Sequence, residues 1–152
     1  RYVLYQGSPP PMHTRFCWAV PYPLDQKAME IAAGHLLGRH NFRAFSAHRG
    51  EGNCLEDFVR TLMRLDLRRQ GRRCLIWTVQ ADGFLYKMVR RLVGALVEVG
   101  RGKLAPEAIP LLLAAQERAP AIVTAPAQGL FLDKVFYESQ LSGSSAFPPQ
   151  DV

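Results

Sequence analysis

The segment from Gly83 to Lys103 holds the residues whose types and spacing most clearly suggest chemistry. On a helix, Arg90 would lie among apolar residues, three or four positions from Tyr86 and Val93, and not on the polar side. A partly buried guanidinium needs a carboxylate or phosphate partner, because an unpaired buried charge is expensive. Arg90 is therefore a candidate anion-binding residue. The alternative, which the periodicity leaves open, is that its side chain extends to water and serves no site.

The positive charge of the chain is concentrated in its central part. The 152 residues carry a formal net charge of +6, yet residues 39–103 alone hold 14 Lys or Arg against 6 Asp or Glu, a net of +8. This distribution excludes a basic tail as the source of the charge. It fits a surface that binds nucleic acid and, equally, a solvated arginine-rich surface without a partner.

Other kinds of chemistry have little support in the sequence. The three cysteines form no C-x-x-C pair, which argues against a disulfide framework or a zinc ribbon and favours a reducing compartment. The four histidines show no ligand spacing, so we expect no metal. Ser46 and His48 are two residues apart and do not make a triad. Since no apolar run reaches about 18 residues, we expect no membrane span.

The elements that must position these residues follow from hydrophobic periodicity and turn residues. Strands are predicted at residues 1–5, 15–20, 58–68, 74–80 and 130–138. Helices are predicted at residues 25–37, 83–99 and 106–115, and a long loop at residues 41–56. Because the order contains a hairpin rather than strand–helix–strand units, it predicts an α/β (α+β) domain with a mainly antiparallel sheet and flanking helices.

Three local details of these elements bear on the site. Alternation along the strand at residues 58–68 predicts one basic face, made by Arg60, Arg64 and Arg68. Asp25 and Asp82 are placed to cap the helices that follow them. Pro110 is expected to kink or shorten the third helix, because proline cannot donate a helical hydrogen bond.

Residues 84–102 resemble the signature of the TruA-type tRNA pseudouridine synthases. The family pattern is close to F-x-x-x-M-V-R-N-I-V-G-x-L-x-E-V-G-x-G, and here Arg91 and Leu92 replace its Asn and Ile. Further segments resemble family motifs in the family's order: the end of K/R-x-Y-x-Y at Tyr2, P-L-D at 23–25, L-x-G-x-H-D-F-x-x-F at 37–45, V-R-T-I at 59–62 and T-A-P-A-H-G-L at 124–130. Here Asn41 stands in place of the Asp of the third motif, and Gln128 in place of the His of the last. The resemblance covers residues 1–138 and leaves residues 139–152 as a Ser/Pro-rich tail.

The resemblance implies a pseudouridine-synthase-like half-domain from an enzyme that isomerises uridine to pseudouridine in tRNA without a cofactor. In this family an Asp in the motif G-R-T-D-x-G-V-H of the N-terminal half starts the reaction. The present sequence contains no such motif, so it is similar to the C-terminal half alone, and we expect it to be inactive by itself. The resemblance also makes Arg90 the catalytic partner of that absent Asp, because a guanidinium can hold a carboxylate bidentately and keep it ionised.

Further site residues follow from the resemblance and from the charge pattern. The expected substrate pocket, an apolar wall for a flipped-out base, consists of Phe84, Leu85, Met88 and Tyr2. The residues expected to hold RNA phosphates are Arg60, Arg64, Arg68, Lys87, Arg91, Arg101 and Lys103.

The resemblance implies tRNA and the N-terminal half of the same enzyme as partners, and it is compatible with a homodimer. The expected location is the cytoplasm or an organelle of a eukaryote. Two other classes of function stay open from the sequence. One is a non-catalytic RNA- or ribonucleoprotein-binding relic of this domain. The other is an oligomerisation domain whose positive charge is incidental.

Overall fold

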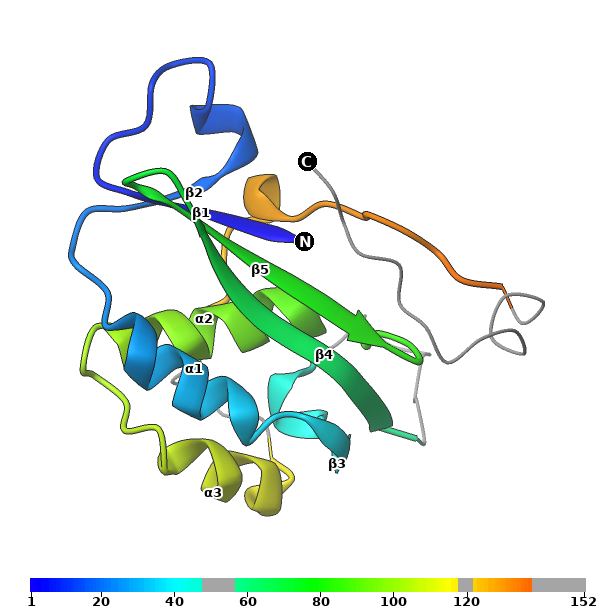
Figure 1. Ribbon diagram of the computed structural model, residues 1–152. Coiled ribbons are helices and arrows are strands. Elements are labelled where there is room, and N and C mark those ends of the chain that lie inside the picture. Colours follow the sequence, from blue (N-terminus) through cyan, green and yellow to red (C-terminus); the bar gives the residue numbers. More distant parts are fainter. Residues whose placement is uncertain (48–56, 118–121, 138–152) are drawn as a thin grey trace.

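The chain forms a five-stranded sheet with helices against it, described for residues 1–47, 57–117 and 122–137 of a computed structural model (Figure 1). The strands are β1 (Tyr2–Gln6), β2 (Trp18–Val20), β3 (Gly38–Asn41), β4 (Val59–Gln70) and β5 (Cys74–Ala81). The helices are α1 (Gln26–Gly34), α2 (Met88–Gly100) and α3 (Ala108–Ala115). Short 3₁₀ turns lie at Thr14–Phe16, Arg43–Phe45 and Ala127–Gly129. The predicted α+β class is confirmed.

The strand order across the sheet is β2-β1-β5-β4-β3. Three of the four neighbouring pairs are antiparallel, and only β1 and β2 are parallel. The predicted hairpin joins β4 to β5 and closes where Gln70 pairs with Cys74. Gly71 supplies the positive φ of +67° that this tight turn requires. The sheet is therefore mainly antiparallel, as the sequence predicts.

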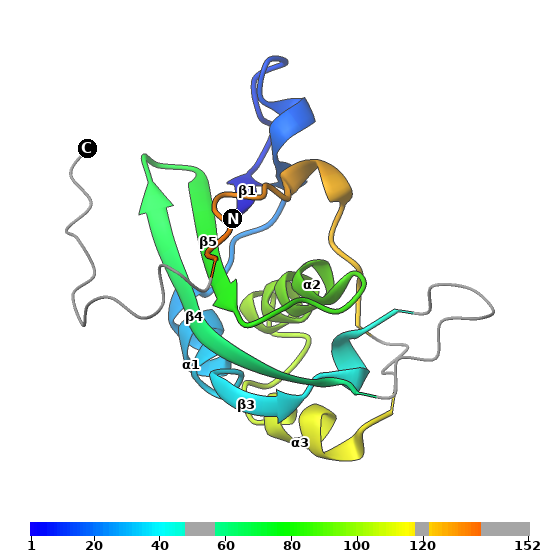
Figure 2. The same cartoon turned by 90° about the vertical axis from the view of Figure 1, so that its right-hand side faces the viewer.

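The core lies between one face of the sheet and the helices (Figures 1 and 2). Alternate strand residues such as Leu4 and Trp77 are fully buried, and so are Met29 of α1 and Leu92 of α2. Burying a large apolar side chain of this kind stabilises the fold by about 1.5–3 kcal/mol. Asp25 caps α1 as predicted, because its carboxylate accepts a hydrogen bond from the Ala28 nitrogen at 3.0 Å.

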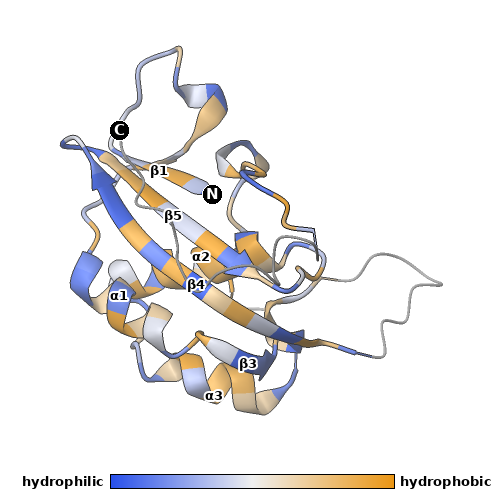
Figure 3. Ribbon diagram, turned by 45° about the vertical axis from the view of Figure 1, so that its right-hand side comes forward, coloured by the Kyte–Doolittle hydropathy of each residue, from blue (hydrophilic) through white to orange (hydrophobic). Residues whose placement is uncertain are grey.

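The predicted basic face of β4 is wrong, because a β-bulge interrupts the strand between Leu62 and Arg64. Leu62 and Leu65 are both buried although they are three residues apart, so the alternation changes phase at the bulge. Arg60 precedes the bulge and shares a side with Leu62. Arg64 and Arg68 follow it and lie on the opposite, open face of the sheet. Figure 3 shows the resulting mixture of polar and apolar residues along β4 and β5.

The helix that carries Arg90 begins at Met88 and not at Gly83. Lys87 precedes it in the left-handed region, with φ of +59°, and this conformation ends any continuous helix from residue 83. Asp82 therefore does not cap α2. Its carboxylate instead accepts a hydrogen bond from the Thr61 nitrogen of β4 at 2.9 Å. The loop between β5 and α2 is thus hydrogen-bonded to β4 through Asp82 at its start, and it changes direction at Lys87 just before α2.

Three further expectations differ from the structure. Residues 130–137 form no strand, since their only ladder contact is an isolated bridge between Leu130 and Tyr2. The helix α1 ends at Gly34, and the chain then turns at Gly38, with φ of +97°, into the unpredicted edge strand β3. The helix α3 begins at Ala108, two residues later than predicted, so Pro110 lies in its first turn, where a proline removes no intrahelical bond.

Candidate functional site

Arg90 lies in the first turn of α2 and is half-buried. Its Nε donates a hydrogen bond of 2.6 Å to the carbonyl oxygen of Ala125, and the Ala125 nitrogen donates one of 3.0 Å to the carbonyl oxygen of Arg90. Within the described ranges, the terminal nitrogens of this guanidinium have neither a hydrogen bond nor an ion pair. The outer edge of the guanidinium, which can bind both oxygens of one carboxylate, is therefore open.

The loop that contacts Arg90 lies directly on α2 because residue 94 is a glycine. A Cβ at Gly94 would come within 1.8 Å of the carbonyl oxygen of Val123, so only glycine allows this approach. Ala125, two residues further along, has no exposed surface. The Gly94 contact and the paired hydrogen bonds between Arg90 and Ala125 thus hold loop and helix in one arrangement.

Tyr2 fixes the other end of the same loop. Its hydroxyl donates a hydrogen bond of 2.7 Å to the carbonyl oxygen of Pro126, and its side chain is fully buried. Burial raises the pKa of this phenol, and the positive charge of Arg90 opposes that shift. Arg90, Tyr2 and residues 123–126 therefore form one connected corner of the molecule, which we call the Arg90 corner.

The four residues expected to line a substrate pocket lie in different environments. Tyr2, Leu85 and Met88 are at most 4% exposed and belong to the core. Phe84 is 46% exposed and is the one member that offers a large surface to another molecule. The structure therefore buries three of these residues and leaves Phe84 as the one with a large exposed surface.

An exposed apolar segment extends from the same corner. Residues 130–137 run away from the sheet beside the start of β1 (Figure 1). The backbones of Arg1 and Phe131 exchange two hydrogen bonds of 2.8 Å at its beginning. Further along, Leu132 is 83% exposed and Val135 is 52% exposed. An extended, apolar segment without a neighbouring strand is a site at which another strand or domain can pair.

The seven basic residues expected to contact RNA are dispersed, and several have partners of their own. Arg101 donates to Glu98 at 2.7 Å and stacks on the ring of Tyr22 at 4.0 Å. Arg91 donates to the carbonyl oxygen of Ala44 at 3.2 Å. Contacts of this kind hold the fold together.

The other five expected RNA contacts also lie apart. Arg60 has an ion pair of 3.8 Å with Asp57, and Arg64 has one with Asp66. Lys87 lies over the ring of Tyr86 at 5.2 Å. The two remaining residues, Arg68 and Lys103, are exposed. Because of the bulge in β4, Arg60 lies on the opposite side of the strand from Arg64 and Arg68, so the seven do not share one face of the sheet.

One basic cluster was predicted only in part, because Arg68 was among the expected RNA contacts and the three arginines beside it were not. The hairpin between β4 and β5 ends in Arg68-Arg-Gln-Gly-Arg-Arg73, and all four arginines are exposed. The run of arginines on both sides of a Gln-Gly turn was the available indication.

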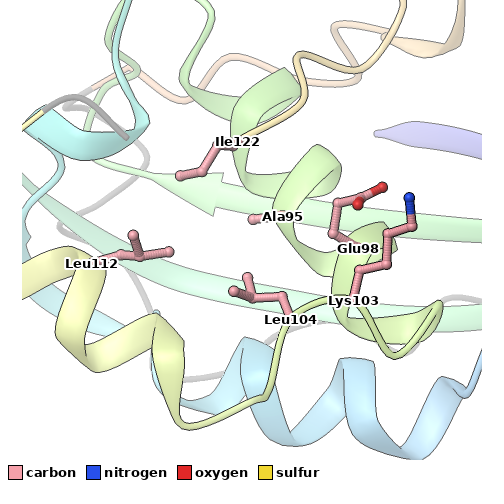
Figure 4. Close-up of a pocket in the computed structure, with 6 residues that line it drawn as sticks. All are labelled: Ala95, Glu98, Lys103, Leu104, Leu112 and Ile122. Atoms are coloured by element: carbon pink, nitrogen blue, oxygen red, sulfur yellow. The ribbon is translucent and has the colours of Figure 1, made fainter. Parts of the chain in front are cut away.

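Two hollows lie outside the Arg90 corner. One, of about 250 Å³, lies between α2 and α3, with Leu104, Leu112 and Ile122 on its apolar side and Glu98 with Lys103 at one end (Figure 4). The other, of about 400 Å³, lies on the open face of the sheet beside Tyr5 and Ile76. Neither contains a group of three His, Cys, Asp or Glu side chains that could hold a metal ion, and no such group occurs in the described ranges.

The thiols and the buried hydroxyl of the described chain do not suggest an alternative catalytic group. Burial raises the pKa of the Cys17 thiol, and the nearby Cys74 adds to that shift; burial also raises the pKa of Cys74. A thiol of raised pKa is a weak nucleophile at neutral pH. Ser46 is 2% exposed and its hydroxyl donates to the carbonyl oxygen of Arg43, so it holds a turn.

In the Arg90 corner, a helix carries a guanidinium whose terminal nitrogens have no partner among the described residues. Comparison with known proteins identifies the family of the chain. A family model described as tRNA pseudouridine synthase matches residues 32–138, and the chain belongs to that family.

Individual relatives show how much of such a protein the chain represents. It is similar to the tRNA pseudouridine synthase A of Moorella thermoacetica, with 44% identity over 138 residues, which is 90% of this chain and 54% of that protein. It is 38% identical to the tRNA pseudouridine synthase A of Nitratidesulfovibrio vulgaris over 155 residues, 84% of this chain and 54% of that protein. The chain spans about half the length of these relatives. In the described ranges, none of its helices has the length and apolar character to cross a bilayer.

Proposed function

We propose that this chain is the C-terminal half of a tRNA pseudouridine synthase and is inactive alone. In this proposal an N-terminal half carries the nucleophilic Asp, and the present half supplies Arg90 and an RNA-binding surface. The substrate is uridine within tRNA, and the product is pseudouridine. The location that follows is wherever tRNA is modified, in the cytoplasm or in an organelle.

The observation that carries this proposal is the state of the Arg90 guanidinium. Nε is engaged by the Ala125 carbonyl oxygen, which fixes the plane of the group, and the terminal nitrogens are open. A carboxylate held there by two parallel hydrogen bonds stays ionised at neutral pH and faces in one direction. Lysine would supply the charge without the planar pair of donors. Arg90 is thus suited to position a carboxylate nucleophile and cannot itself be one.

In the proposal, one pocket residue contacts the substrate and the other three support it. Phe84, which is exposed, would contact the flipped-out base. Leu85, Met88 and Tyr2 would support the wall from behind. This division predicts that substitutions at Phe84 act on substrate binding and that those at the three buried residues act first on stability.

An N-terminal half is the proposed partner of the segment at residues 130–137. That segment is apolar, extended and exposed, and it begins at the Arg90 corner. Docking there would bring the second half next to the open guanidinium and would cover Leu132 and Val135. Formation of a homodimer belongs to the same proposal and can be tested by light scattering of the assembled protein.

Reconstitution tests the function directly. The purified chain, a separately purified N-terminal half that contains G-R-T-D-x-G-V-H, and their mixture are each incubated with tRNA. Pseudouridine is then measured by chromatography of the digested RNA. We expect product only in the mixture. Pseudouridine made by the present chain alone would contradict the proposal.

A second candidate function is a non-catalytic RNA-binding module, favoured by the exposed arginines of the hairpin between β4 and β5. The two candidates differ in what the gene encodes upstream. A G-R-T-D-x-G-V-H motif in the same reading frame supports the enzyme. A reading frame that starts near Arg1 supports the binding module.

A further inference from the structure

The end of the hairpin between β4 and β5 carries the densest positive charge of the described chain. Arg68, Arg69, Arg72 and Arg73 lie within six consecutive residues that include no acid. All four are exposed, and none has an ion pair among the residues that the structure describes. Figure 3 shows this end of the hairpin in the hydrophilic colour. We call these four residues the hairpin cluster.

The hairpin cluster is held by the fold and is not a flexible tail. The strands are paired up to Gln70 and Cys74, and the Gln6 nitrogen donates a 2.7 Å hydrogen bond to the Arg73 carbonyl oxygen. Arg69 also donates to the carbonyl oxygen of Arg72 at 3.1 Å. Arg68, Arg72 and Arg73 have no ion pair among the described residues. A rigid backbone that presents such guanidiniums loses little conformational entropy when it binds a polyanion.

An aromatic hollow adjoins the hairpin cluster on the open face of the sheet. It measures about 400 Å³, and Gln70 and Cys74 of the hairpin form part of its wall. Tyr5, Phe16 and Phe131 also line it, and the rings of Phe16 and Phe131 are 6.4 Å apart. Guanidiniums beside exposed aromatic rings are the combination that binds an unpaired nucleotide, with the phosphate on the charge and the base against a ring.

This surface is separate from the Arg90 corner. Val3 and Tyr5 face the hollow, whereas Tyr2 and Leu4 face the helices, because alternate strand residues point to opposite sides. Along the strands, Tyr2 pairs with Trp77, three residues from the closure of the hairpin at Cys74, which is about 10 Å. A single nucleotide cannot occupy both places.

We propose that the hairpin cluster and the aromatic hollow form a second RNA contact, which binds the phosphates and one unpaired base of the substrate RNA away from the target uridine. The inference rests on the proposed function in taking RNA as the polyanion. An acidic protein segment would use the charge but would leave the aromatic hollow unexplained.

The test measures binding and needs no catalysis. Binding of tRNA by the 152-residue chain is measured by fluorescence anisotropy over a range of salt concentrations. The variant R68Q/R72Q/R73Q removes three charges and leaves Arg69, which contacts the Arg72 backbone. The matched control R68K/R72K/R73K keeps the charges. A third variant, F16L, removes one ring of the hollow and keeps it apolar.

The expected results follow from counterion release. In the triple glutamine variant, the plot of log association constant against log salt concentration should be less steep, by about 0.9 for each lost phosphate contact. Binding at low salt should be at least about tenfold weaker. The lysine control should keep the slope, and F16L should weaken binding several-fold with the slope unchanged. Circular dichroism of each variant confirms that it is folded.

The opposite results are equally specific. If the glutamine variant keeps the wild-type slope, or F16L keeps the wild-type affinity, the second contact is wrong while the proposed function stands. If the wild-type chain itself binds tRNA without any salt dependence, the proposed RNA function fails together with this inference.

Discussion

The two ends of α2 each carry a half-buried arginine, and the two arginines are used differently. At the C-terminal end, Arg101 is saturated: Glu98 binds it at 2.7 Å and Tyr22 stacks on it at 4.0 Å. Near the N-terminal end, Arg90 is held only through Nε, and its terminal nitrogens have no partner in the ranges described. A cation near a helix C-terminus also interacts favourably with the helix dipole, whereas one in the first turn does not.

The difference teaches how a structural arginine is distinguished from one that is available to a site. Both residues are basic, both lie on an amphipathic helix, and burial alone does not separate them. What separates them is whether the positions of the guanidinium that bind an anion are filled. The guanidinium of Arg101 is occupied by partners within the fold. Arg90 keeps free the positions with which we propose it binds a carboxylate of the N-terminal half.

The largest expected effect comes from exchanging each arginine for lysine in an enzyme that contains both halves. Arg90→Lys should lower kcat/KM at least about a hundredfold, because a lysine cannot bind a carboxylate bidentately in a fixed plane. Arg101→Lys should change kcat/KM less than about threefold. Single-turnover kinetics on tRNA measure both. Near-normal turnover of Arg90→Lys would remove the role assigned to Arg90.

A second prediction concerns the glycines that lie near each arginine. Gly94→Ala should lower the free energy of unfolding by about 2–3 kcal/mol, because the new Cβ would meet the Val123 backbone at 1.8 Å. Gly100→Ala should cost about 1 kcal/mol, since its nearest neighbour is the flexible side chain of Met29 at 2.6 Å. Urea unfolding of the chain gives both values. Equal costs would show that the loop at residues 122–126 is not held rigidly against α2.

The structural role of Arg101 gives a smaller effect. Arg101→Gln should lower the free energy of unfolding by about 1–2 kcal/mol, because it leaves the Glu98 carboxylate, whose side chain is 15% exposed, without its cation. The double variant Arg101→Gln/Glu98→Gln should recover part of this loss. A double variant that is less stable than Arg101→Gln would mean that the pair is not what makes Arg101 structural.

The smallest predicted effect is the pH dependence that Tyr2 contributes to the Arg90 corner. Burial raises the pKa of Tyr2 above its ordinary value in the folded state, while Arg90 opposes the shift. The folded state therefore holds the phenol proton more tightly than the unfolded state does. The contribution of Tyr2 to the free energy of unfolding is fully present below about pH 10 and declines as the pH rises above that value.

The control for this pH dependence is Tyr2→Phe. Because this variant lacks the hydrogen bond to Pro126, its free energy of unfolding at neutral pH should be about 1 kcal/mol lower than that of the wild type. Its stability should also decline less than that of the wild type as the pH is raised. Thermal unfolding between pH 8 and pH 11 measures the difference between the two proteins. Identical alkaline profiles would contradict the account of Tyr2.

Much of the fold could be predicted because its determinants are local. Periodicity located β4, β5 and α1, and the side chain of Asp25 marked the start of α1 correctly. The incorrect predictions concern features that are determined by tertiary contacts. The bulge after Leu62 and the bond from Thr61 to Asp82 depend on neighbouring strands, and no alternation within one segment reveals them.

In the site too, features that depend on local sequence could be predicted, and features that depend on tertiary contacts could not. The helix pattern identified Arg90 as a charge among apolar residues, which the structure confirms as half-buried. The contact of its Nε with Ala125, 35 residues away, could not be predicted from spacing, since it depends on the approach of a loop to Gly94. The partners of Arg101 could not be predicted for the same reason, and its contact with RNA stays a prediction.

The most direct test of the central claim is a double-mutant cycle in an enzyme that carries both halves. Single-turnover rates on tRNA are measured for Arg90→Lys, for Asp→Asn in the G-R-T-D-x-G-V-H motif, and for the two combined. If Arg90 acts by holding that Asp, the double variant should be no slower than the slower single variant, because both changes remove one function. Losses that multiply, as for two independent sites, would contradict the account.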